Sequence, residues 1–268
     1  MTDMKEQILS FLPSEYPWKD RLFVFPELDS TNNRLKELAS QGAPHGTVLI
    51  ADRQTGGRGR MGRSFLSPPG VGIYMSILLR PECAPQDLMH LTCAVAAAMC
   101  RAVEHSVGLR PGIKWTNDLV WGKQKFAGIL TEMGLNSTGG VDWAIVGIGV
   151  NCCQRAEDFP SEIRDRACSL AMAAGRKIDR CRVAAAMMEA LWEMDASLFT
   201  GKENMLRFYR ENCVTIGKEI SVVGAGEIRH GRALDVDDKG ALVVQFSDSH
   251  VEAVNAGEVS IRGMYGYV

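Results

Sequence analysis

The chain has 268 residues, of which 46% are hydrophobic and 23% charged, the composition of a soluble globular protein with one large domain or a large and a small one. Its formal net charge of -2 argues against a surface dedicated to nucleic acid, because such proteins carry a basic domain or stripe. The 8 cysteines form no Cys-x-x-Cys pair, so we expect reduced thiols in a cytosolic protein.

The first residues lack a basic segment followed by an apolar run, and no stretch approaches the length of an apolar membrane span. We therefore expect neither a signal peptide nor a membrane helix.

Hydrophobic periodicity, capping residues and turn residues predict an alternation of helices and strands along the first 214 residues. The predicted helices span residues 4–12, 29–40, 85–106, 180–199 and 202–211. The predicted strands span residues 22–25, 48–51, 72–79, 113–115, 119–121, 126–135 and 143–150, with a hairpin turn at 136–140. The longest helix, 85–106, is rich in Ala, Met and Leu, so we expect it to be largely buried.

After Cys213 the sequence changes to short alternating segments separated by glycine-rich turns. This texture predicts a small all-β unit, which we expect to be a barrel because closure removes exposed strand edges. The expected domains are therefore residues 1–214 and 215–268.

Residues 52–63, Asp-Arg-Gln-Thr-Gly-Gly-Arg-Gly-Arg-Met-Gly-Arg, hold four arginines and four glycines in twelve positions without apolar periodicity. The pattern predicts a loop, called the arginine loop below. In it, glycine lets backbone amides approach a ligand and arginine offers forked, permanently charged donors. Such a loop suits phosphate or carboxylate. Taken alone, it is equally typical of a solvated surface loop or of a tract that binds nucleic acid.

Four segments in order resemble the biotin–protein ligase family. They are Ser30-Thr-Asn32, Gln54 to Arg63, Lys114-Trp-Thr-Asn-Asp118 with Lys125-Phe-Ala-Gly-Ile-Leu130, and Gly147-Ile-Gly-Val-Asn151. The resemblance covers about residues 22–262 and implies an α+β fold, with a mixed β-sheet flanked by helices and a small C-terminal β-barrel. It also implies an enzyme that uses ATP and Mg²⁺ to join biotin, through biotinyl-5'-AMP, to a lysine of a biotin carboxyl carrier protein.

The resemblance assigns roles to individual residues. The catalytic residues would be Lys125, Arg60 and Arg58, placed where negative charge develops. Biotin would be bound by Ser30, Thr31, Asn32, Gln54, Gly57, Arg58, Gly59, Arg60, Lys125, Gly128, Leu130, Gly147 and Gly149. ATP and the adenylate would be bound by Arg63, Phe65, Trp115, Asn117, Asn151 and Arg262, and Asp118 would help to hold the metal ion.

Several of these residues also have local explanations. Ser30 and Thr31 are good helix caps, Trp115 suits a plain core position, Asp118 is an ordinary turn former, and Lys125 fits an exposed hairpin.

The chain also departs from the family pattern in two places. Thr116 replaces a proline, and Phe65 replaces a tryptophan that would cover the purine, with less area for that purpose.

Two other functions remain open at this point. A lipoyl or octanoyl ligase shares the catalytic fold and the adenylate chemistry, although the arginine loop and the Lys125 segment favour biotin. The second alternative is a non-enzymatic nucleic-acid-binding regulator. The near-neutral charge and the short segment of about twenty residues before the core argue against it. We expect a homodimer only by resemblance, and no DNA-binding domain.

Overall fold

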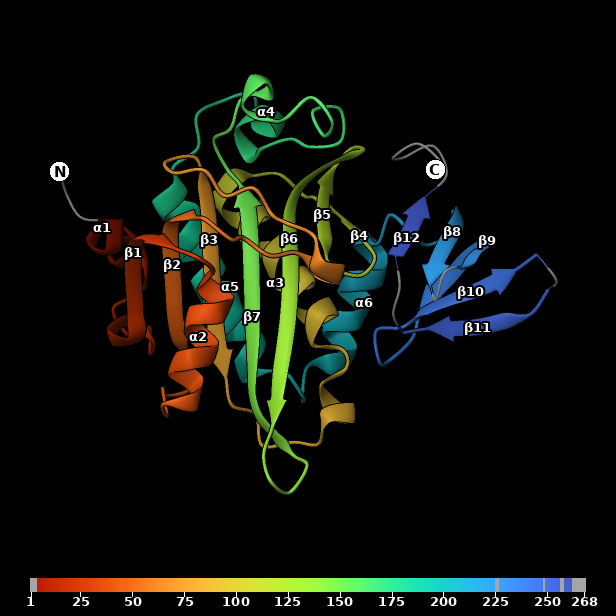
Figure 1. Cartoon of the computed structure of the whole chain (residues 1–268), viewed down its shortest axis with the longest axis horizontal. Helices are drawn as coiled ribbons and strands as arrows, with labels where there is room; N and C mark the ends of the chain where they lie inside the picture. Colours follow the sequence, from red (N-terminus) through yellow and green to blue (C-terminus); the bar gives the residue numbers. More distant parts are fainter. Residues whose placement is uncertain (1–3, 225–226, 248, 256–257, 262–268) are drawn as a thin grey trace.

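The computed structural model describes residues 4–224, 227–247, 249–255 and 258–261. They form a large sheet covered by helices and, beside it, a smaller C-terminal sheet (Figure 1). The large sheet has seven strands in the order β1-β2-β3-β7-β6-β5-β4. Its strands are β1 (Leu22–Leu28), β2 (Thr47–Gln54), β3 (Gly72–Leu79), β4 (Gly112–Lys114), β5 (Asp118–Trp121), β6 (Gln124–Leu135) and β7 (Val141–Asn151).

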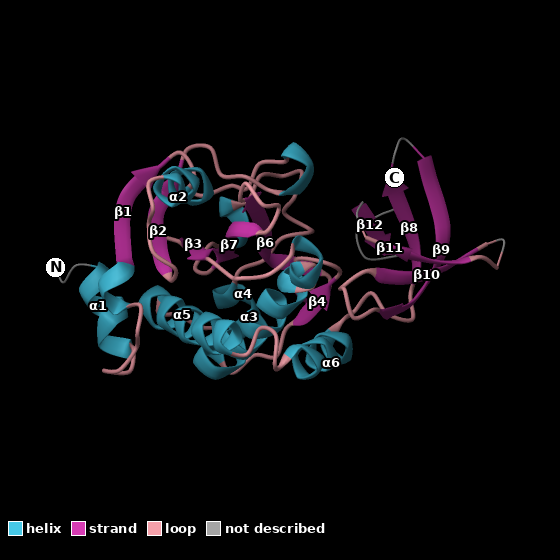
Figure 2. Cartoon of the chain, turned by 90° about the horizontal axis from the view of Figure 1, so that it is seen from below, coloured by secondary structure: helices cyan, strands magenta, loops and turns pink. Residues whose placement is uncertain are grey.

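Helices cover the two faces of this sheet unequally (Figure 2). Helix α2 (Thr31–Ser40) lies on one face, while α1 (Met4–Phe11), α3 (Leu91–Val107), α5 (Arg180–Ala196) and α6 (Lys202–Asn212) gather on the other. Helices α3 and α5 are rich in alanine and pack directly against each other. On the face with α2, the arginine loop between β2 and β3 crosses the sheet beside that helix (Figure 1).

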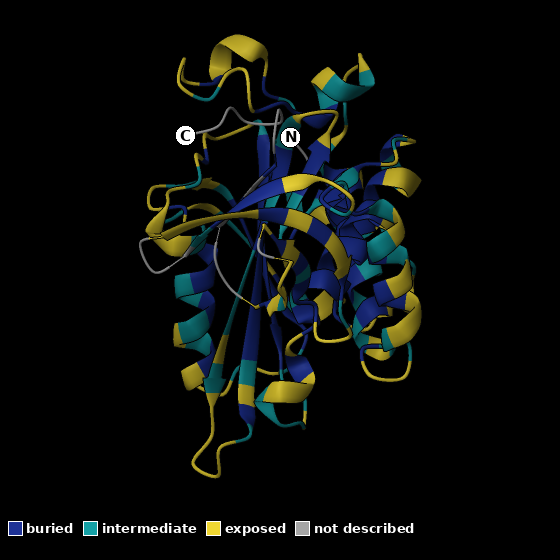
Figure 3. Ribbon diagram, turned by 90° about the vertical axis from the view of Figure 1, so that its right-hand side faces the viewer, coloured by how far each residue is buried: buried dark blue, intermediate teal, exposed yellow. Residues whose placement is uncertain are grey.

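The centre of the sheet is apolar on both faces because both are covered. All eight residues of β3 are buried, and buried side chains follow the strands of the large sheet while exposed residues lie mainly on outer helix turns and the C-terminal strands (Figure 3). Strand β1 pairs with β2 in parallel and the other pairings are antiparallel. The predicted mixed sheet flanked by helices is therefore confirmed.

The C-terminal unit is a five-stranded antiparallel sheet in the order β11-β10-β9-β8-β12. Its strands are β8 (Glu219–Gly224), β9 (Glu227–Val236), β10 (Leu242–Phe246), β11 (Val251–Val254) and β12 (Glu258–Ile261). This confirms the expected small all-β unit. Within the residues described, the ladder does not pair β11 with β12, so the unit is an open sheet where a closed barrel was expected.

Hydrogen bonds join the two units around Trp115, which follows β4. The indole Nε1 of Trp115 donates to the Gly240 carbonyl oxygen at 2.9 Å, and the Trp115 backbone nitrogen donates to Thr215 Oγ1 at 2.9 Å. The Gly240 carbonyl also accepts from the Cys93 thiol of α3. The C-terminal unit is thus bonded to the segment that leads into the turn of Asn117.

The largest differences from the predicted helices lie in three places. The segment predicted as one helix over 85–106 begins with a 3-10 turn at Pro85–Leu88, and α3 follows from Leu91. Helix α5 ends at Ala196, earlier than the predicted residue 199, and the short helix α4 (Leu170–Ala174) was not predicted. All eight cysteines are free, as expected. Among the described residues, none of the helices combines the length and apolar character that crossing a bilayer requires.

Candidate active site

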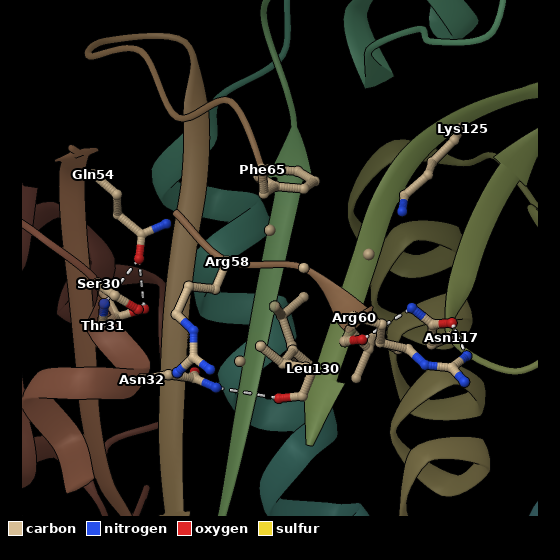
Figure 4. Close-up of a pocket in the computed structure, with 16 residues that line it drawn as sticks. Ser30, Thr31, Asn32, Gln54, Arg58, Arg60, Phe65, Asn117, Lys125 and Leu130 are labelled. Carbon is tan, nitrogen blue, oxygen red and sulfur yellow. Dashed lines mark hydrogen bonds between the residues drawn. The ribbon is translucent and has the colours of Figure 1, made fainter. Parts of the chain in front are cut away.

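A cavity lies on the α2 face of the large sheet, where the arginine loop passes over β7 and β6 (Figure 4). It brings together all four sequence segments singled out above. Its lining consists of Ser30, Thr31, Asn32, Gln54, Arg58, Gly59, Arg60, Phe65, Asn117, Lys125, Gly128, Ile129, Leu130, Gly147, Ile148 and Gly149.

The arginine loop is folded back on itself by backbone hydrogen bonds. The Phe65 amide donates to the Gly57 carbonyl at 2.9 Å, and the Gly59 amide donates to the Arg63 carbonyl at 2.7 Å. Met61 at φ 54° and Gly62 at φ 74° make the reversal through left-handed backbone, a conformation that glycine tolerates best. A short 3-10 turn, Arg60–Gly62, is the only regular structure between β2 and β3 in the described chain.

One end of the cavity is polar and uncharged. Ser30 is the N-cap of α2 and accepts from the Asn33 amide. Gln54 Oε1 accepts from both the Thr31 amide (2.8 Å) and the Thr31 hydroxyl (3.0 Å), while Gln54 Nε2 donates to Ser67. The bonds from Thr31 orient the Gln54 amide. Ser30 caps the helix and also lines the cavity, so its two expected roles are compatible.

Asn32 sits beside this polar end, over Gly147 of β7. Its Oδ1 accepts from the Ser76 hydroxyl at 2.6 Å, and its Nδ2 donates to Glu132 Oε2 at 2.8 Å and to the Leu130 carbonyl at 3.4 Å. A Cβ on Gly147 would lie 2.1 Å from Asn32 Oδ1, so glycine is needed here to make room for the asparagine side chain.

A charged cluster flanks Asn32 at the outer rim. Glu132 Oε1 lies 2.6 Å from Lys36 Nζ and 3.3 Å from Arg58 Nη1, and Arg58 also donates to Asn33 Oδ1 at 3.0 Å. Burial by itself raises the pKa of the Glu132 carboxyl, but hydrogen bonds from Lys36 and Asn32 outweigh it and hold that pKa below its usual value. The carboxylate is therefore ionised at neutral pH.

The other end of the cavity is cationic. Arg60 Nη1 donates to Asn117 Oδ1 at 2.7 Å, and Asn117 Nδ2 donates to Asp118 Oδ1 at 3.1 Å. The same Asp118 oxygen lies 2.7 Å from Lys125 Nζ. This series of hydrogen bonds places Arg60 and Lys125 around the single carboxylate of Asp118. Both cationic side chains lie at the end of the cavity remote from Thr31 (Figure 4).

Two glycines leave space for neighbouring side chains. A Cβ on Gly149 would lie 2.6 Å from the Phe65 ring, and one on Gly128 would lie 3.0 Å from Lys125 Nζ. The sequence interpretation gave these glycines close contact with a ligand. In the structure the space over them holds Phe65 and Lys125, so the ring and the ammonium group lie directly on the sheet.

Some predicted residues lie outside the cavity lining. Arg63 is exposed, and Trp115 is buried against the C-terminal unit. Asn151 is buried, with Nδ2 donating to the Cys168 carbonyl and Oδ1 accepting from Gln154. Arg262 lies outside the described residues. Gly57 supports the loop, because a Cβ there would be 2.3 Å from the Phe65 carbonyl oxygen.

Three residues that shape the site were not predicted from the sequence, namely Ser76, Lys36 and Glu132. Glu132 lies two residues after Leu130 on β6, and the period-two alternation of a strand puts both on one face. That alternation was the available signal for Glu132. Ser76 is a fully buried serine in an otherwise largely apolar strand, and a buried hydroxyl requires a hydrogen-bond partner.

The arrangement suits an elongated ligand with a neutral polar group at one end and an anion at the other, the latter meeting Lys125 and Arg60. On a mixed sheet with this loop, it defines a small-molecule-binding catalytic domain. Residues 24–151 match the model of the Biotin/lipoate A/B protein ligase family, and residues 215–262 match the Biotin protein ligase C terminal domain.

Known proteins resemble the chain over most of its length. It is 36% identical to the Bifunctional ligase/repressor BirA of Bacillus subtilis over 82% of this chain and 68% of the relative, and 31% identical to the Biotin--[acetyl-CoA-carboxylase] ligase of Mycobacterium tuberculosis over 90% and 89%. The structure of the Aquifex aeolicus biotin protein ligase in complex with biotin and ATP superposes with a TM-score of 0.76 at 32% identity, over 90% of this chain and 98% of that one. The chain belongs to the biotin protein ligase family.

Proposed function

We propose that this protein attaches biotin to a lysine of a biotin carboxyl carrier protein or domain, through a biotinyl-5'-AMP intermediate formed from ATP. The observation that carries the proposal is the two-ended cavity. The neutral end around Thr31 and Gln54 suits the ureido ring of biotin, and the cationic end at Lys125 and Arg60 suits its carboxylate beside the α-phosphate of ATP. The family of the chain supports the same assignment.

In the first step a biotin carboxylate oxygen attacks the α-phosphorus of ATP. A carboxyl-oxygen–phosphorus bond forms and the bond to pyrophosphate breaks, so negative charge grows on the phosphate oxygens. Lys125 and Arg60 are already held in place by Asp118 and Asn117. They stabilise that charge with little rearrangement, which is the main source of catalysis in such sites.

In the second step the neutral amine of the acceptor lysine attacks the biotinyl carbonyl carbon. The amide bond forms, AMP leaves, and the amine gives up a proton. The acyl-adenylate hydrolyses readily in water, so the arginine loop, which crosses the cavity and carries Phe65 onto Gly149, protects it by excluding solvent.

In this proposal Mg²⁺ binds to the site together with ATP. Among the described residues no group of three or more His, Cys, Asp or Glu side chains forms a metal cage, and Mg²⁺ typically binds through one or two carboxylates plus substrate phosphates. The Asp118 carboxylate fits that need, and the ion would neutralise phosphate charge there. Exchange activity should disappear with EDTA and return with added Mg²⁺.

We further propose that residues 1–214 carry both chemical steps and that residues 215–268 form a separate domain supporting the nucleotide end. The cavity lining lies wholly within the first range. The homodimer and the cytosolic location stay predictions.

The first test is ATP–pyrophosphate exchange with purified protein, comparing biotin, lipoate and octanoate. Exchange that depends on biotin, followed by transfer of radiolabelled biotin to a carrier domain, is the expected result. Exchange driven by lipoate or octanoate would instead assign the protein to the related lipoyl or octanoyl ligases. Absence of exchange with all three acids, together with salt-sensitive binding of nucleic acid, would favour the binding-protein alternative.

A further inference from the structure

We propose that Glu132 is a positioning residue for the biotin end of the site: it docks the arginine loop through Arg58 and fixes the orientation of the Asn32 amide in the cavity wall. The inference rests on the proposed function, and it concerns a residue outside the four sequence segments that carry the family resemblance.

The carboxylate of Glu132 uses both of its oxygens. Oε1 receives Lys36 and Arg58, at 2.6 and 3.3 Å, and Oε2 receives Asn32 Nδ2 at 2.8 Å. The side chain is 21% exposed, so these contacts are only partly screened by water. One group on β6 thereby joins helix α2 and the arginine loop.

The contact with Asn32 selects one of two amide orientations. An ionised carboxylate only accepts hydrogen bonds, so the Asn32 group that faces it must be the NH₂. The amide oxygen then points to Ser76, whose hydroxyl donates to it at 2.6 Å. Asn32 lines the cavity beside Thr31, so Glu132 and Ser76 together fix the orientation of one amide in the cavity wall.

The contact with Arg58 ties down the first half of the loop. Arg58 points toward Asn32 and away from Lys125 (Figure 4), and its Nη1 bonds both Glu132 and Asn33. Arg60 bonds Asn117 farther along the same loop. The loop is therefore held over the sheet on both sides of Gly59, and Arg58 acts on the ligand indirectly, by docking the loop.

The central variant is Glu132→Gln. A glutamine keeps the size of the side chain but presents an NH₂ group either to the cations or to Asn32, so the network loses a docking contact or the fixed amide orientation. We expect the KM for biotin to rise about tenfold, with kcat of exchange and the KM for ATP changing less than about threefold, because loss of binding alone leaves kcat intact. Loosening of the loop should also shorten the lifetime of bound biotinyl-adenylate.

The matched control is Glu252→Gln, which makes the same change in the Arg229–Glu252 pair of the C-terminal unit, 2.7 Å apart. It should leave both KM values unchanged. If Glu132→Gln leaves the KM for biotin and the adenylate lifetime as in the unmodified protein, the proposal is overturned. A parallel fall of kcat and melting temperature without a change in that KM would also overturn it, because it would show a merely structural role.

A double-mutant cycle with Arg58→Met tests the route of action. Residues that act through one contact give losses that do not add, whereas independent contacts give additive losses. Additivity would mean that Arg58 meets the ligand directly and would refute the docking role. Should Glu132→Gln not fold, Glu132→Asp withdraws the carboxylate by one methylene and carries the same expectations. Failure of biotin-dependent exchange in the unmodified protein would reject the proposed function itself, a distinct result.

Discussion

The substitution Gly147→Ala tests the steric basis of the biotin end of the cavity. The new Cβ would lie 2.1 Å from Asn32 Oδ1 and 2.8 Å from Asn32 Cγ, far inside van der Waals contact. Asn32 is only 4% exposed and is bonded to Ser76 and Glu132, so it cannot yield without losing those bonds.

The expected cost follows from the bonds that Asn32 gives up. A hydrogen bond to a charged group contributes about 1.5–3 kcal/mol and a neutral one about 1 kcal/mol, so the folded state should lose roughly 2–4 kcal/mol. For a chain of this size that corresponds to a fall in melting temperature of roughly 4–16 °C. The KM for biotin should rise as well, because the displaced amide lines the cavity.

Differential scanning calorimetry and biotin-dependent pyrophosphate exchange measure the two effects. Gly56→Ala is the control within the arginine loop, since its Cβ would find its nearest neighbour, the Asp29 carbonyl oxygen, at an ordinary 3.4 Å. A Gly147→Ala protein that melts and binds biotin like the unmodified protein would refute the argument that glycine is required there to accommodate Asn32.

Three further predictions concern other parts of the molecule. Lys125→Met should lower kcat of exchange by about a hundredfold or more while the melting temperature stays nearly constant, because Lys125 lies at the cavity surface; wild-type turnover would remove it from the mechanism. Glu132, whose pKa is lowered by folding, contributes stability that is present above its ordinary pKa of 4.5 and lost as pH falls through the lowered value. The melting-temperature difference between the unmodified protein and Glu132→Gln should therefore shrink below about pH 4.5, and a difference independent of pH would contradict the ionic role. Trp115→Phe removes the bond to the Gly240 carbonyl and should cost about 1 kcal/mol in urea unfolding, whereas no loss would show that this bond does not stabilise the fold.

The strand pattern of the large sheet was predictable because its strands are apolar and well separated by turns. All seven strands were expected, and the α+β class and the helix over α2 are confirmed. The interruption before Leu91 was not predicted, because Pro85 is tolerated at a helix start and the composition on both sides of the break favours a helix.

The sequence motifs also identified most of the cavity wall. Segments from α2, the arginine loop, β6 and β7 meet there, as their shared resemblance implied. The contacts between them were not predictable, since the bond between Glu132 and Arg58 joins residues 74 positions apart. Nor does local sequence reveal that Asn151 spends its amide on Cys168 and Gln154. Such pairings depend on how the elements are brought together in space.

The carbonyl group of Gly240 links the two units by accepting two hydrogen bonds from the larger one. It accepts from the Trp115 indole and from the Cys93 thiol, so a single peptide group in the turn between β9 and β10 satisfies two buried donors of the larger domain. Severing the chain near residue 214 would expose the Trp115 indole and leave both donors without this acceptor. An isolated first domain should thus be prone to self-association, and any shift of the C-terminal unit would act directly on Trp115, two residues from Asn117, and on Cys93 of α3.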